Sequence, residues 1–121
     1  MKVAAIQMVS GTDAATNLQN ALDLIALGAD QTCELIALPE YFCLLGKRDT
    51  DKLSLAENEG NGRLQDALQS AASRHGVWIV AGTLPLKSDS SDRVFNASLV
   101  FNPISYKMAK PSSLVCITSL L

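Results

Sequence analysis

The chain has 121 residues, of which 48% are hydrophobic and 18% charged, and its formal net charge is -2. This length suffices for one domain with a buried core, and the composition is typical of a soluble globular protein. The weak negative charge gives no basic surface for nucleic acid, and every apolar run is shorter than the ~18 residues of a membrane span. The N-terminus lacks the apolar segment of a signal peptide, so we expect a cytoplasmic protein without nucleic-acid or membrane partners.

The first part of the chain alternates between apolar segments and an amphipathic helix. Residues 2–9, KVAAIQMV, predict a short buried strand. From Asp13 to Ala29 the apolar side chains recur at the spacing of one helix face, which predicts an amphipathic helix. Residues 33–39, CELIALP, predict a second buried strand that ends at Pro39, because proline has no amide hydrogen to donate to a ladder.

The second part of the chain predicts a helix and then a hairpin. After a polar stretch, a helix is expected to end at Gly76; its apolar residues are Leu64, Ala67, Leu68, Ala71 and Ala72. Residues 77–84, VWIVAGTL, predict a third strand, and residues 85–92 a polar loop. Residues 93–101, RVFNASLVF, predict a fourth strand paired with the third as a hairpin.

This order of elements predicts an α/β fold. The expected sheet is mixed, with its first strands parallel and both helices on one face, because parallel crossovers are right-handed. The first three strands are nearly continuous apolar runs, so they should be buried on both faces. The second face must then be covered by residues outside this chain or by a partner.

The cysteines and the histidine predict neither a disulfide framework nor a metal site. Cys33, Cys43 and Cys116 are an odd number without CxxC spacing. His75 is the only histidine, and it precedes Gly76 at an expected helix end, where the dipole favours an imidazole. We therefore expect a structural role for His75, and no metal and no cofactor.

Five segments together resemble the N-terminal part of the nitrilase, or carbon-nitrogen hydrolase, superfamily. They are MKVAAIQM, NLQNALDLIALGAD, ELIALPEYF, GNGRLQDALQSAASRHGVWIVAGTLP and RVFNASLVFNP. Within this superfamily, LPEYFCLLGKRDTDK is most similar to the deaminated-glutathione and ω-amidase-like amidases. The resemblance implies the N-terminal part of a nitrilase-type α-β-β-α sandwich and pairing of subunits as dimers. It divides the chain into a partial hydrolase domain, 1–103, and a divergent tail, 104–121.

The resemblance also implies an amidase with a Glu, Lys, Cys triad, in which Glu40 matches the family's glutamate as general base. A protonated thiol is a poor nucleophile, so a carboxylate must take its proton before it attacks a small ω-amide or a related C–N bond. Without the resemblance, a carboxylate after Leu-Pro is better explained as a polar residue in a loop or at a helix start.

The chain departs from the family pattern after Pro103. Lys107 and Lys110 lack the flanking residues of the family's lysine, so we expect both to be solvated tail charges. Cys116 lacks the family's nucleophile motif, and Cys43 is expected to pack in its loop. No triad lysine or cysteine is therefore found.

Two functions follow from these observations. In the first, the chain is a truncated amidase-type hydrolase that is inactive alone, and its substrate in the complete family is a small-molecule amide. In the second, it is a non-catalytic half-subunit that binds a partner through its open sheet face or dimer helix. In both we expect a homo-oligomer or aggregate through the exposed sheet face.

Overall fold

The computed structural model describes residues 1–48, 50–104 and 114–120. The elements are β1 (Val3–Ala5), α1 (Ala14–Asp30), β2 (Leu35–Ala37), α2 (Asp51–Leu55), α3 (Arg63–His75), β3 (Trp78–Lys87), β4 (Val94–Phe101) and β5 (Leu114–Leu120). The strands of the described ranges form one sheet in the order β1-β2-β3-β4-β5. The first three are parallel, whereas β4 and β5 are antiparallel to their neighbours. The predicted α/β mixed sheet is confirmed.

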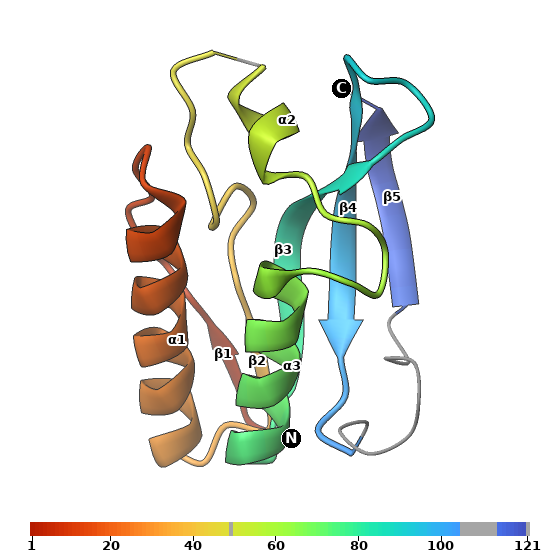
Figure 1. Cartoon of the computed structure of the whole chain (residues 1–121). Coiled ribbons are helices and arrows are strands. Elements are labelled where there is room, and N and C mark those ends of the chain that lie inside the picture. The colour runs from red at the N-terminus through yellow and green to blue at the C-terminus, as the bar shows by residue number, and fades with distance from the viewer. Residues whose placement is uncertain (49, 105–113, 121) are drawn as a thin grey trace.

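Both long helices lie on one face of the sheet, as the sequence predicts (Figure 1). α1 begins after Asp13, whose side chain accepts a hydrogen bond from the Ala15 amide at 3.3 Å. α3 ends at His75 because Gly76 adopts the left-handed conformation, with φ of 66°, and its amide bonds the Ala72 carbonyl. His75 therefore lies at a helix end, as predicted.

The core lies between these helices and the central strands. Its fully buried large side chains are Phe42, Phe101, Ile25, Ile36, Leu68, Ile79, Leu84 and Leu99. They come from α1, α3, β2, β3, β4 and the loop after β2, and each such burial contributes roughly 1.5–3 kcal/mol. The loop after β2 is therefore part of the core, which fixes the position of the residues around it.

The opposite face of the sheet is largely uncovered. Val3, Leu35 and Trp78 lie in register across β1, β2 and β3. Val3 is 55% exposed and Trp78 40% exposed. β5 extends the sheet beside β4 and does not cover this face (Figure 1). Helices of the described chain cover only the other face, so the prediction that residues outside this chain or a partner cover this one stays a prediction.

Several strands and helices differ from the predicted ones in their bounds or were not predicted. β1 and β2 are each three residues long and shorter than predicted, and α2 and β5 were not predicted. β3 extends to Lys87 through Pro85, which the sequence placed in a loop. Beyond Val80, β3 no longer pairs with β2 and becomes an edge, where a proline is tolerated. There the carbonyl of Pro85 accepts the Glu57 amide at 3.1 Å.

Among the helices of the described residues, none is long and apolar enough to span a bilayer.

Candidate active site

A β-bulge in β3 shapes the region next to the end of β2. The ladder with β4 pairs Ala81 with Leu99 and Leu84 with Ala97, so β3 carries one extra residue over this span. The bulge contains Gly82 and Thr83. Bulges are common beside active sites because they redirect side chains.

The turn after β2 packs directly against this bulge. A Cβ placed on Gly82 would lie 2.1 Å from the Pro39 carbonyl oxygen and 2.5 Å from that of Leu38. Only a residue without a side chain allows backbones to approach this closely. The contact brings the next residue, Glu40, to the β3–β4 hairpin.

Glu40 lies where the sequence predicts, just beyond the C-terminal end of β2, and it is exposed. Its Oε1 accepts a hydrogen bond from Nδ2 of Asn96, a buried residue of β4, at 3.2 Å. The next amide, of Tyr41, donates to Oγ1 of Thr83 at 3.2 Å. Tyr41 has a φ of 58°, an uncommon conformation for a bulky residue and typical of functional loops. Two contacts with the hairpin thus fix this turn.

A small cavity of about 10 Å³ lies beside Asn96, with room for about one water molecule. Its lining residues are Tyr41, Cys43, Leu44, Lys52, Thr83, Pro85 and Asn96. The Lys52 ammonium lies 3.6 Å from the centroid of the Tyr41 ring, within range of a cation–π contact. Sequence reasoning singled out neither Lys52 nor Asn96, although both belong to the segments that carry the family resemblance.

Cys43 packs in the loop after β2, as expected. Its side chain is buried, and its Sγ lies 3.8 Å from the Thr83 carbonyl oxygen. Burial raises the pKa of the thiol from 9.0 to about 11. The thiol is therefore protonated near neutral pH, which makes it a poor nucleophile.

We expect Cys43 of the folded chain to alkylate slowly with iodoacetamide at pH 8. A rise from 9.0 to about 11 lowers the thiolate fraction roughly a hundredfold, and burial slows the reagent further. Because the folded pKa is the higher one, the protonated thiol stabilises the fold below pH 9, and this contribution is lost as the pH rises through about 11. Mass spectrometry of the Cys43 peptide, native and in denaturant, measures the rates, and equal rates would contradict the prediction.

The structure brings none of the other residues considered for the triad into a described contact with Glu40. Lys107 and Lys110 lie outside the described residues. Cys116 lies on β5, where its backbone pairs with Ser98, so the expectation that it is no nucleophile stays a prediction. In the described parts of the chain, no three histidine, cysteine or acidic residues are close enough to hold a metal ion.

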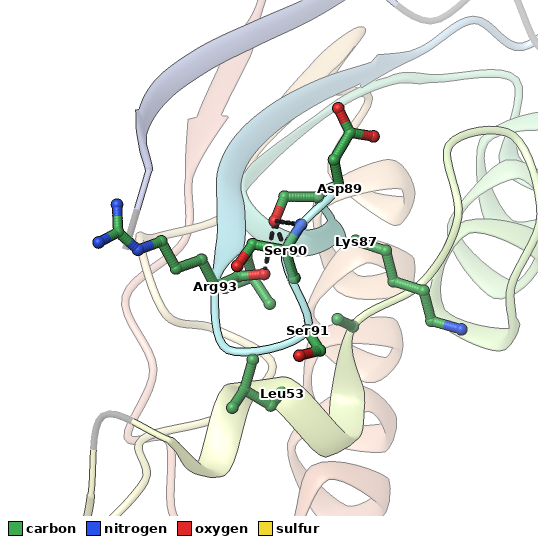
Figure 2. Close-up of a pocket in the computed structure, with 9 residues that line it drawn as sticks. Leu53, Lys87, Asp89, Ser90, Ser91 and Arg93 are labelled. Atoms are coloured by element: carbon green, nitrogen blue, oxygen red, sulfur yellow. Dashed lines mark hydrogen bonds between the residues drawn. The ribbon is translucent and has the colours of Figure 1, made fainter.

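A larger pocket of about 370 Å³ lies between α2 and the loop that joins β3 to β4. Leu53 of α2 and Ser91 of the loop are among the residues that line it (Figure 2). The side chains of Lys87 and Arg93 extend away from each other (Figure 2). Within the loop, Ser88 Oγ accepts a hydrogen bond from the Ser90 amide and donates one to the Arg93 carbonyl. The charged groups do not converge, so this pocket shows no arrangement suited to catalysis.

Comparison with known proteins decides the family. Residues 2–110 match the model of the family described as carbon-nitrogen hydrolase. This chain belongs to the carbon-nitrogen hydrolase family. A curated relative, deaminated glutathione amidase of Synechocystis, is 34% identical over 108 residues, which are 88% of this chain and 39% of that protein. The omega-amidase NIT3 of Saccharomyces cerevisiae is 28% identical over 109 residues, 84% of this chain and 37% of that protein.

A solved structure supports the same family assignment. The crystal structure of Saccharomyces cerevisiae Nit3, a member of branch 10 of the nitrilase superfamily, matches with a TM-score of 0.72 at 27% identity. The match covers 85% of this chain and 40% of that one. The expected nitrilase-type fold is thus confirmed, and the chain spans about two-fifths of the length of the relatives it matches.

Proposed function

We propose that this chain is the N-terminal part of an amidase-type carbon-nitrogen hydrolase, truncated relative to the family, and that Glu40 is its general base. The observation that carries the proposal is the exposed carboxylate at the end of β2, one oxygen of which accepts the Asn96 amide. The names of two relatives, deaminated glutathione amidase and omega-amidase, favour a small ω-amide as the substrate. The proposal includes a partial hydrolase domain, residues 1–103, followed by a divergent tail, residues 104–121. It also includes a cytoplasmic location.

The proposed reaction gives Glu40 four proton transfers. Its carboxylate takes the proton of a cysteine thiol, and the sulfur attacks the amide carbonyl carbon. The C–N bond then breaks, and Glu40 returns the proton to the leaving nitrogen. Glu40 then takes a proton from water, whose oxygen attacks the thioester. Finally the C–S bond breaks, Glu40 returns this proton to the sulfur, and the products are a carboxylic acid and ammonia.

The thiol and the lysine of this scheme are not assigned to the 121 residues. The resemblance requires both, the lysine to stabilise negative charge on the carbonyl oxygen in a water-excluded site. Since the chain spans about two-fifths of its relatives' length, we propose that segments equivalent to the rest of those relatives complete the site.

We expect that the 121-residue chain alone releases no ammonia from a small ω-amide. Residues 1–103 joined to the C-terminal part of the Synechocystis amidase should release it, because the joined protein regains a lysine and a cysteine. The measurement is ammonia release by the two purified proteins. Turnover by the 121-residue chain that Cys43→Ala or Cys116→Ala abolishes would contradict the proposal, and so would a folded joined protein without turnover.

The uncovered sheet face favours a second candidate, a non-catalytic subunit that associates through this face. Exposed Val3 and Trp78 flank Leu35 in one row across three strands, and apolar patches of this kind mark interaction surfaces. We expect the 121-residue chain to associate with itself and to bind a hydrophobic dye, and Trp78→Lys to reduce both. Light scattering tests this expectation. A monodisperse monomer that binds no dye would contradict it.

A further inference from the structure

We infer that Asn96 is the positioning residue of Glu40: its side-chain amide holds one carboxylate oxygen and aims the other at the proton to be moved. The inference rests on the proposed function, because positioning matters only if Glu40 exchanges protons. Asn96 and Glu40 are 56 positions apart in the chain, and Nδ2 of Asn96 lies 3.2 Å from Oε1 of Glu40.

The two side chains differ in how firmly their surroundings hold them. Asn96 is 5% exposed and lies within β4, opposite Pro85 of β3 and Ser119 of β5. Neighbouring strands therefore hold its backbone on both sides, and burial restricts its side chain. Glu40 is exposed and lies in a turn, where a glutamate side chain populates several rotamers unless a partner fixes it. Asn96 is thus the rigid member of the pair and Glu40 the member that is oriented.

The chemistry of an amide suits this task. Asn96 donates from Nδ2 to Oε1 of Glu40, and within the described residues this is the side-chain hydrogen bond that the Glu40 carboxylate accepts. The second oxygen, Oε2, is then the one that we infer takes the proton. A lysine or arginine at the same place would stabilise the ionised carboxylate through its positive charge and so weaken it as a base. Asparagine carries no charge, so it can orient the carboxylate without this effect.

The backbone of the turn is held separately from the carboxylate. The Tyr41 amide donates to Thr83 Oγ1, and Pro39 packs on Gly82, so both contacts persist when the Asn96 amide is removed. A substitution of Asn96 should therefore free the carboxylate while the turn stays in place. This separation makes the inference testable in the folded 121-residue chain without any turnover.

The test is infrared difference spectroscopy of the 121-residue chain. The spectrum of each protein minus that of its Glu40→Gln counterpart isolates the carboxylate band of Glu40. We expect a narrow band in the unaltered chain, because one geometry dominates. Asn96→Leu, which is close in size to asparagine, and Asn96→Ala, neither of which can donate, should broaden the band to the width obtained for exposed Glu59 by the same subtraction.

The matched control is Ser98→Ala, which removes the hydrogen bond from Ser98 Oγ to the Ala81 carbonyl on the same strand. It should leave the Glu40 band narrow. Circular dichroism identifies which Asn96 variant is folded, and either one suffices. An unchanged band in a folded Asn96 variant overturns the inference, and so does equal broadening in Ser98→Ala. Full activity of a joined protein carrying Glu40→Gln would instead overturn the proposed function and leave the Asn96–Glu40 contact standing.

Discussion

Glu40→Gln is expected to lower the amidase rate of the joined protein about 10²- to 10⁴-fold, the usual worth of a general base. Glutamine is nearly isosteric with glutamate, and its side-chain oxygen can still accept the Asn96 amide, so the fold should persist. It cannot take a proton from a thiol or from water. The measurements are the rate of ammonia release and the melting temperature of the joined protein and its variant.

A control at the other end of the same strand separates catalysis from stability. Glu34 precedes β2, and its side chain is 64% exposed. Glu34→Gln should change the free energy of unfolding by no more than about 0.5 kcal/mol and leave the rate unchanged. If Glu40 is only a polar residue after a strand, Glu40→Gln should behave in the same way. Full rate in the Glu40 variant would exclude Glu40 as the base.

The elements that could be predicted from the sequence are those determined by local patterns. The two long helices were found because their apolar side chains recur along one face and because Gly76 ends the second. β5 and the extension of β3 through Pro85 depend on neighbours distant in the chain. Glu57 holds the extension: its amide donates to the Pro85 carbonyl, and its carbonyl accepts the Lys87 amide. No local sequence pattern indicates this contact.

In the candidate site, too, only the residue with a local sequence signal could be predicted. Glu40 could be singled out because Leu-Pro-Glu follows an apolar strand within a family-like segment. Asn96 and Thr83 could not be, because they meet the turn after β2 only once the hairpin folds beside it. The bulge that places Thr83 there results from a register difference between β3 and β4, and Gly82, a glycine inside a strand, is the one local signal of it.

Gly82→Ala is expected to destabilise the chain by about 3 kcal/mol or more, at the upper end of the cost of overpacking. The new methyl group would lie 2.1 Å from the Pro39 carbonyl oxygen and 2.3 Å from its carbon. These are backbone atoms, so no rotamer change relieves the clash, and either β3 or the turn after β2 must move. Urea unfolding of the 121-residue chain measures the loss.

Substitutions at two other glycines serve as controls for this prediction. A Cβ on Gly11 would meet no atom within 4 Å, so Gly11→Ala should be neutral or stabilise by up to about 1 kcal/mol through the unfolded state. Gly76→Ala meets no atom either, but its φ of 66° should cost about 1–2 kcal/mol. In the joined protein, Gly82→Ala should also lower the rate of the fraction that folds, because the displaced Pro39 carries Glu40 away from Asn96. If Gly82→Ala is no more destabilising than Gly76→Ala, the close contact between the turn and the bulge does not hold Glu40 in place.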